Sequence, residues 1–317
     1  MSTTHQLTVT NIPSDIGSLL KGKSLAPEAF RKAKLIPKVE AAGYNVTEQN
    51  ALPSGPATWS FNPSTAPNGV RNEAANVEVN HQVKRTILDG LSNQYSDPPF
   101  QLVIGGECNN LPAVLSALWQ GLAPARIGLI YVDADADLSV PGPESSGTLA
   151  SMTFTHLTMA PGALESMRPF TRPDGEGVVD ASNVVLFGLN TALQSNTRSQ
   201  MGYLMDEGYR VFTSAAVAKD PKSAAKQAIR FLENRVDHIF VHLDVDAIDG
   251  TAFPLANVPQ RTGAGFNEVI RAVKGLLNHD KVCGLMVAEV NPDHDPGLEM
   301  TNKLVDSLVE GLRERLP

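Results

Sequence analysis

The stretch that decides the fold is IGLIYVDADAD, at residues 127–137. Its first six residues are apolar at nearly every position, which is typical of strands in a parallel sheet that helices cover on both faces. Three aspartates follow at alternate positions, Asp133, Asp135 and Asp137. Alternate residues of an extended chain point to the same side. The stretch therefore predicts a buried strand whose end aims several carboxylates at one region.

Similar short apolar runs recur along the chain and alternate with amphipathic stretches that have helical spacing. The other runs lie at residues 7–9, 102–104, 184–187, 239–243 and 285–290, and the helical stretches at residues 27–42, 222–234 and 300–316. This alternation predicts a three-layer α/β/α fold with a mostly parallel central sheet. We expect residues 1–317 to form a single domain, with the last helix opened by Thr301 or a neighbour.

Two stretches have the composition of loops. Residues 52–69 are rich in Pro, Ser, Asn and Gly and show no periodicity, which predicts a long surface loop. Residues 139–147 come directly after the acidic strand end. Open α/β sheets bind their ligands beyond the carboxyl ends of the strands, so we expect this second loop to lie beside a site.

Composition excludes several classes of partner. The formal net charge is −8, and Lys and Arg are scattered without a basic stripe, so we expect no nucleic-acid partner. The first residues lack an apolar signal segment, and no run approaches the about 18 apolar residues of a membrane span. There are only two cysteines, Cys108 and Cys283, which fits a reducing compartment. These features predict a cytoplasmic protein that does not bind membranes.

Acidic residues follow two further strands. Asp244 and Asp246 lie in VHLDVDAID, and Glu289 lies in VAEVNP. An isolated acidic residue after a strand is usually a helix cap or a salt-bridge partner, but two D-x-D strand ends and a glutamate are hard to explain in that way. Carboxylates brought so close repel one another unless a cation is bound. Oxygen ligands suit Mg, Ca or Mn, and a nearby thiolate or imidazole shifts the preference toward transition metals.

Four blocks now resemble the arginase, agmatinase and formiminoglutamase (ureohydrolase) family. That family has GGDHS, DAHxD, SxDxDxxDP and E-x-NP in this order, and here the blocks are GGECN at 105–109, DADAD at 133–137, HLDVDAIDG at 242–250 and EVNP at 289–292. SSGTLASM at 145–152 resembles the family's SGNxHGM segment. The similarity covers nearly the whole chain and implies the arginase fold.

The resemblance implies a binuclear manganese site. One metal would be held by Cys108, Asp133, Asp137 and Asp244, and the other by Asp133, Asp135, Asp244 and Asp246. Cys108 and Asp135 stand where the family has histidines, and the extra negative charge suggests that one metal position is retained while the other is weak, empty or filled by a harder ion. The alternative for Cys108 is a small buried apolar residue without a ligand role.

The resemblance also implies roles around the metals. Asp137 would orient the nucleophile and carry its proton, and Glu289 would pair with a cationic substrate head; its alternative is a strand-end salt bridge. Ser139, Ser146 and Thr148 would bind a substrate carboxylate, unless they only form turns. Ala150 replaces the family's proton-shuttling histidine, for which His294 is either a substitute or a solvated loop residue.

We therefore expect a Mn²⁺-dependent C–N hydrolase of the amidinohydrolase type, acting on a small guanidino or amidine compound. The branch of the family with cysteine at the first ligand position also has HLD in place of SxD, and some of its members act on modified arginines. The expected substrates therefore include an N-substituted arginine in a specialised pathway. The alternatives are a catalytically weak or inactive ligand-binding or regulatory subunit, and a metal enzyme with other chemistry on the same scaffold. The family's trimers and hexamers imply a homo-oligomer.

Overall fold

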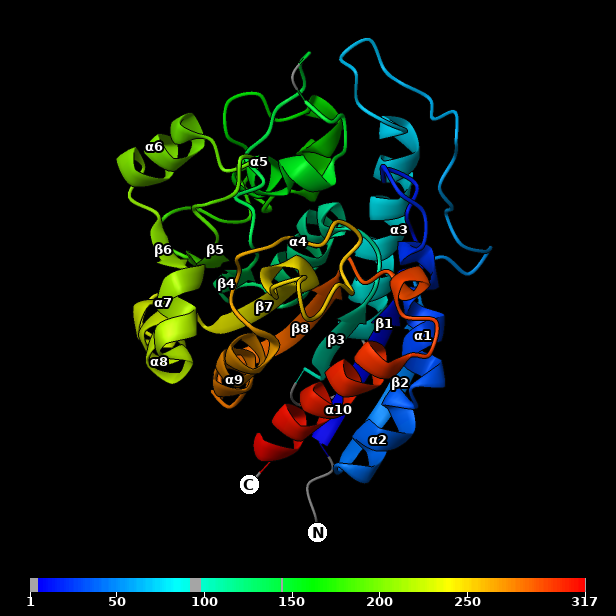
Figure 1. Cartoon of the computed structure of the whole chain (residues 1–317), viewed down its shortest axis with the longest axis vertical. Coiled ribbons are helices and arrows are strands. Elements are labelled where there is room, and N and C mark those ends of the chain that lie inside the picture. Colours follow the sequence, from blue (N-terminus) through cyan, green and yellow to red (C-terminus); the bar gives the residue numbers. More distant parts are fainter. Residues whose placement is uncertain (1–4, 92–97, 144, 317) are drawn as a thin grey trace.

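A central eight-stranded sheet organises the molecule (Figure 1). The computed structural model describes residues 5–91, 98–143 and 145–316. Every strand pair is parallel, and the strand order is β2-β1-β3-β8-β7-β4-β5-β6. The strands are β1 (His5–Asn11), β2 (Tyr44–Asn50), β3 (Phe100–Ile104), β4 (Ile127–Val132), β5 (Val184–Leu189), β6 (Arg210–Thr213), β7 (His238–Asp244) and β8 (Val282–Ala288). The predicted parallel sheet is confirmed.

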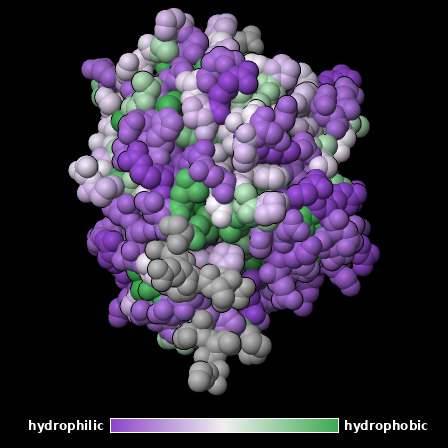
Figure 2. Space-filling model, turned by 180° about the vertical axis from the view of Figure 1, so that it is seen from behind, coloured by the Kyte–Doolittle hydropathy of each residue, from purple (hydrophilic) through white to green (hydrophobic). Residues whose placement is uncertain are grey.

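Helices cover both faces of the sheet, so the three-layer prediction is also confirmed. One core cluster packs beneath α1 (Ala26–Lys32), α2 (Leu35–Ala41), α7 (Ser214–Lys219), α8 (Pro221–Leu232), α9 (Phe266–Leu277) and α10 (Glu299–Glu314). The second lies beneath α3 (Glu73–Leu91), α4 (Leu111–Gly121), α5 (Thr153–Thr158) and α6 (Arg198–Asp206). Figure 2 shows that the outer surface on the side away from α10 is mostly hydrophilic. The apolar residues of these helices are buried in the two core clusters, as burial of apolar area requires.

The six apolar runs of the sequence all become strands, but β2 and β6 are additional. Both lie at the edges of the sheet, and their side chains are largely half-buried or exposed. A strand that is not buried on both faces lacks a continuous apolar run. The periodicity of the sequence therefore identifies the six inner strands and not the two edges.

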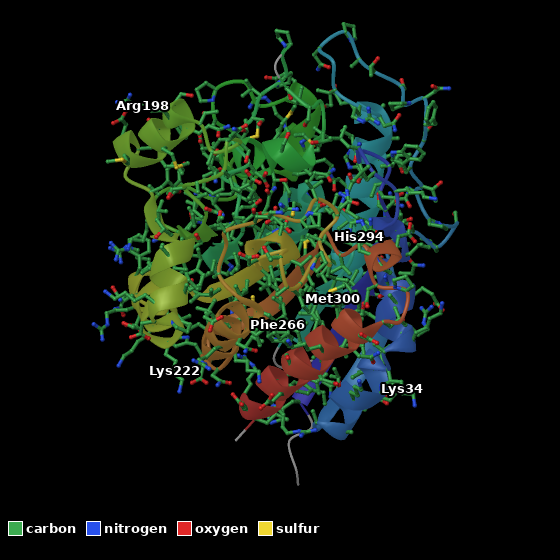
Figure 3. All side chains as sticks on the ribbon, in the orientation of Figure 1. Lys34, Arg198, Lys222, Phe266, His294 and Met300 are labelled. Carbon is green, nitrogen blue, oxygen red and sulfur yellow. The ribbon has the colours of Figure 1, made fainter. Side chains whose placement is uncertain are left out.

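The stretch at residues 27–42 forms two helices rather than the one expected. Lys34, labelled in Figure 3, has a left-handed backbone with φ of 61°, and α1 ends before it while α2 begins after it. At the C-terminus, α10 begins at Glu299, so Thr301 lies inside the first turn and does not open the helix. The carboxylate of Asp295 instead accepts hydrogen bonds from Thr301 N at 2.7 Å and Thr301 Oγ1 at 2.8 Å.

The two predicted loops carry no regular secondary structure where they are described. Residues 52–69 extend from the body of the molecule between β2 and α3, at the upper right of Figure 1. The loop at 139–147 follows β4, and Glu144 within it lies outside the described residues. In the described part of the chain, no helix combines the length and apolar character needed to cross a bilayer.

His156 on α5 is a buried titratable group away from the strand ends. Its side chain is 1% exposed, and neither ring nitrogen has a hydrogen-bond partner among the described residues. Burial lowers the pKa of His156 to about 4, because the charged imidazolium loses its hydration. In the unfolded chain this histidine has an ordinary pKa of about 6.5. Between about pH 4 and pH 6.5, His156 is therefore protonated in the unfolded chain and neutral in the folded chain.

The pH dependence of folding tests this burial. Stability from neutral His156 is present above about pH 6.5 and is lost as pH falls toward 4, by up to about 3 kcal/mol. We expect the variant His156→Leu to lose less stability than the wild type over this range, measured by urea unfolding at pH 6.5, 5.5 and 4.5. Parallel stability curves for the two proteins would show that His156 does not resist protonation in the fold.

Candidate metal centre

Four neighbouring strands deliver the acidic residues and Cys108 to one edge of the sheet. β3, β8, β7 and β4 are adjacent, and each is followed or ended by one of the sequence blocks. Together they surround a cavity of about 190 Å³. Its lining includes all six carboxylates expected there and the thiol: Cys108, Asp133, Asp135, Asp137, Asp244, Asp246 and Glu289. The convergence inferred from strand alternation is therefore present in the structure.

At this edge of the sheet, three groups of ligand atoms lie closest together. In each group the atoms are all within 4.8 Å of one another, and the groups are Cys108, Asp133 and His242; Cys108, Asp244 and Glu289; and Asp133, Asp244 and Asp246. The Cys108 Sγ atom donates to Asp244 Oδ2 at 2.9 Å. Asp135 and Asp137 line the same cavity but belong to none of these groups.

The two D-x-D motifs turn in the same way. Asp133 Oδ1 accepts from the backbone N of Asp135 at 2.7 Å, and Asp244 Oδ1 accepts from the backbone N of Asp246 at the same distance. Each first aspartate thus fixes the turn of its own strand end with Oδ1, and the Oδ2 atom of Asp244 accepts from Cys108 Sγ. Asp133 Oδ2 is buried and has no hydrogen-bond partner among the described residues.

This arrangement is electrostatically unfavourable without a cation. Burial raises the pKa of Asp133, Asp244 and Asp246 well above the usual aspartate range, and neighbouring carboxylates raise it further. Burial and the charge of Asp244 raise the pKa of the Cys108 thiol in the same way. A divalent ion would offset both the repulsion and the lost hydration. Carboxylate oxygens with one sulfur form a donor set that transition metals accept, so these residues fit a metal.

His242 adds an imidazole to the cluster. Its side chain is fully buried, and its Nε2 atom lies 3.2 Å from Cys108 Sγ. Burial lowers the pKa of His242 to about 3, so the ring is neutral, which is the form that binds metals. The ring stacks on Tyr131 with centroids 4.9 Å apart. Tyr131 in turn donates a 2.5 Å hydrogen bond to Asp137 Oδ2 and so fixes that carboxylate.

Comparison with known proteins agrees with this site. The sequence profile described as "Arginase family" matches residues 5–312. The chain belongs to the arginase family. An arginase from Staphylococcus aureus (strain MRSA252) is 26% identical over 292 residues, which cover 90% of this chain and 91% of that protein.

Solved structures support the same fold. The native arginase of Bacillus caldovelox has a TM-score of 0.82 at 20% identity and 98% coverage of both chains. The formimidoylglutamase of Bacillus subtilis has a TM-score of 0.70 at 17% identity, covering 98% of this chain and 87% of that one. The arginase family is metal-dependent, typically with Mn²⁺, so its chemistry agrees with the donor set described above.

The loop that resembles the arginase family's SGNxHGM segment lies partly at the cavity. Ser139, Ala150 and Ser151 line it, whereas Ser146 and Thr148 are absent from the lining formed by the described residues. Ser146 Oγ lies 2.9 Å from Thr148 Oγ1, which lies 3.2 Å from Ser151 Oγ. These hydroxyls therefore support the loop behind Ser151, and their contact with substrate stays a prediction.

His294 lies apart from the cavity. It is exposed on the turn before α10 and is labelled in Figure 3. Its Nδ1 atom lies 2.9 Å from the backbone oxygen of Ala256. Ala150, at the position of the family's proton-shuttling histidine, offers no proton-transfer group. His294 does not line the cavity formed by the described residues, so it does not replace that histidine in this arrangement.

The sequence did not identify four polar residues of this centre. Ser195, Gln200 and Gln260 line the cavity, and Gln260 Nε2 lies 3.4 Å from Asp135 Oδ2. Lys23 is 2% exposed, and its Nζ atom lies 2.7 Å from Glu289 Oε2. Gln200 is half-buried on the short helix α6 and the other three lie in connecting segments, where polar residues are ordinarily solvated, so no local pattern marks them as part of a site.

Substitution of the cysteine tests its ligand role. If Cys108 binds metal as thiolate, we expect Cys108→Ser to weaken Zn²⁺ and Co²⁺ binding at least about tenfold, and Mn²⁺ binding less, because softer ions gain more from sulfur. Metal content and dissociation constants measure this. The free thiol Cys283, at the start of β8, provides the control Cys283→Ser. Equal metal binding by the wild type and both variants would leave Cys108 as a space-filling residue only.

Proposed function

We propose that this member of the arginase family is a metal-dependent C–N hydrolase of the amidinohydrolase type, acting on a guanidino or amidine compound. The observation that carries the proposal is the group of buried carboxylates with one unpartnered oxygen, Asp133 Oδ2, at the mouth of the central strands. A structural role alone gives no reason to gather so much charge in one cavity.

The donor set supports a Mn²⁺ centre in which Cys108, Asp133, Asp244 and Asp246 provide the closest ligand atoms, with Asp135 and Asp137 as further ligands. A bound divalent ion supplies Lewis acidity, which lowers the pKa of water and polarises a C–N centre. Asp135 lies outside the closest groups of ligand atoms. This supports one well-retained metal position and a second that is weaker.

Two carboxylates act on the reactants in this proposal. Asp137, held by the hydroxyl of Tyr131, orients the attacking water and carries its proton to the departing amine. Glu289 faces the same cavity and contacts the head of the substrate. Ser139 and Ser151 at the rim offer hydroxyls to the remainder of the substrate. An N-substituted arginine is one compound of this class.

A ligand-binding or regulatory role is the second candidate. It is favoured by Ala150, which lines the cavity where the family has its proton-shuttling histidine. Loss of such a general acid–base group lowers turnover by a factor on the order of 10²–10⁴. Both cysteines are free thiols, which supports the cytoplasm as the place where either function operates.

A substrate screen separates the two functions. The protein is loaded with Mn²⁺ and incubated with arginine, N-substituted arginines, agmatine and guanidino acids, and release of urea or amine is measured. The hydrolase proposal expects release from at least one of these compounds. If every compound stays intact at saturating Mn²⁺, the hydrolase proposal fails and the ligand-binding candidate replaces it.

Two variants test the role of Asp137 on whichever substrate is found. We expect Asp137→Asn to lower kcat by about 10²–10⁴-fold, because it cannot take up the proton. Tyr131→Phe keeps the carboxylate and removes only its hydrogen-bond donor, so we expect a smaller loss. Steady-state kinetics with metal content measured in parallel checks both, and near-normal turnover by metal-loaded Asp137→Asn would assign the proton transfer to another group.

A further inference from the structure

A lysine is buried beside the candidate centre, although the resemblance assigns it no role. Lys23 lies 2% exposed between two carboxylates, with Nζ 2.7 Å from Glu289 Oε2 and 3.6 Å from Glu107 Oε1. Burial alone would lower the pKa of Lys23, but the charges of Glu289 and Glu107 raise it above its ordinary value. An ammonium group in this position is a fixed positive charge beside Glu289, which lines the cavity.

The loop that carries Lys23 is held tightly against the segment that carries Glu289. Asn291 Nδ2 donates to the backbone oxygen of Lys21 at 3.0 Å. Gly22 has φ of 123°, and a Cβ atom there would lie 2.0 Å from Asn291 Oδ1, so only glycine permits this approach. Asp15 Oδ2 accepts from Gly22 N at 2.8 Å and from Ser24 Oγ at 3.0 Å. The ion pair is therefore built into the fold and is not an accidental meeting of flexible side chains.

Both oxygens of Glu289 are already engaged. Oε1 accepts from the backbone N of Cys108 at 3.1 Å, and Oε2 accepts from Lys23 Nζ. The backbone of Glu289 is left-handed, with φ of 62°, which is uncommon for a residue with a side chain and fixes the direction of the carboxylate. A guanidinium ion pairs best with a carboxylate that offers two free oxygens and an uncompensated charge. Each oxygen of Glu289 already accepts one hydrogen bond, and the ammonium group that Glu289 shares with Glu107 offsets part of its charge.

We propose that Lys23 is a specificity-determining residue, which neutralises Glu289 so that the site selects an uncharged amidine-type head over a guanidinium cation. The favoured substrate class is an amidine or guanidine whose basicity is lowered by an electron-withdrawing substituent on nitrogen. A neutral head can bind beside the paired Glu289 carboxylate without being repelled by the ammonium group of Lys23. A guanidinium cation is repelled by that ammonium group. This inference rests on the proposed hydrolase function and names the substrate class of the same site.

The test uses a variant that preserves net charge. Lys23→Met combined with Glu107→Gln removes one positive and one negative charge, so Glu107 is not left as an unpaired buried carboxylate and Glu289 is freed. The Mn²⁺-loaded wild type and variant are titrated by calorimetry with butylguanidinium and butylurea, which share a carbon chain and differ in charge. The control is Lys21→Met, which removes an exposed lysine from the same loop.

We expect the wild type to bind butylurea at least as tightly as butylguanidinium. In the double variant the ratio of the two dissociation constants should shift toward the cation by about 10- to 100-fold, the range of a charged hydrogen bond. Lys21→Met should keep the wild-type ratio. A wild type that prefers the cation more than about tenfold overturns the inference even if the double variant does not fold, and an unchanged ratio in a folded variant overturns it too.

The failure of this inference can be distinguished from the failure of the hydrolase proposal. If no compound is hydrolysed but the ratio of dissociation constants shifts as expected, Lys23 remains a charge selector in a ligand-binding protein. If the wild type hydrolyses a guanidinium cation faster than every neutral or less basic analogue, the hydrolase function stands and the role of Lys23 is overturned.

Discussion

The structure depends on how it accommodates six carboxylates that three adjacent strands, β8, β7 and β4, bring to one buried edge of the sheet. Like charges a few ångströms apart repel strongly where water is excluded. The strand-end sequence blocks around the cavity contain no lysine or arginine. A compensating positive charge therefore has to come from another part of the chain. The groups around the cavity can be understood as partial solutions to this problem.

Neighbouring groups offset the charge of some carboxylates more than that of others, and this difference indicates where a metal would bind. Glu289 is paired with Lys23 and with a backbone N–H, and Asp137 is bonded by Tyr131. Asp133 and Asp244 each receive a backbone hydrogen bond on one oxygen. Asp133 Oδ2 is buried without a hydrogen-bond partner among the described residues. The uncompensated charge is therefore concentrated between β4 and β7, at the two D-x-D turns, and a cation bound there removes more repulsion than one bound beside Glu289.

Short-range patterns in the sequence predicted the centre of this arrangement well and its periphery poorly. The inner strands could be identified because burial on both faces leaves a continuous apolar run, and the aspartates because alternation on a strand is a local rule. The edge strands β2 and β6 are only partly buried, and the left-handed turn at Lys34 interrupts a stretch whose helical periodicity continues through it. Neither feature alters the local pattern enough to be predicted.

Lys23 shows why local sequence patterns do not predict the rest of the site. Its partner Glu289 is 266 residues away in sequence, and the burial of the ammonium group is set by Gly22 and Asn291 meeting across two loops. The alternative that the sequence offered for Glu289, a strand-end salt bridge, is present in the structure. It coexists with a position at the cavity, so the two interpretations were not exclusive.

The exchange of residues at Cys108 and His242 follows from packing in the same small space. The family pattern has histidine at the first position and serine at the second, whereas this chain has cysteine and histidine. His242 and Asp244 are alternate residues of β7, so the imidazole lies on the same side as the carboxylate, with Nε2 3.2 Å from the Cys108 sulfur. A small residue at 108 leaves room for the large one at 242, and volume-conserving exchanges of this kind are those that a close-packed interior tolerates. The centre thereby keeps one neutral imidazole, although it enters from β7 instead of from the segment after β3, and it gains a sulfur between two carboxylate-bearing strands. Such a donor set shifts the preference of the site away from the hard alkaline-earth ions that six carboxylates alone would favour.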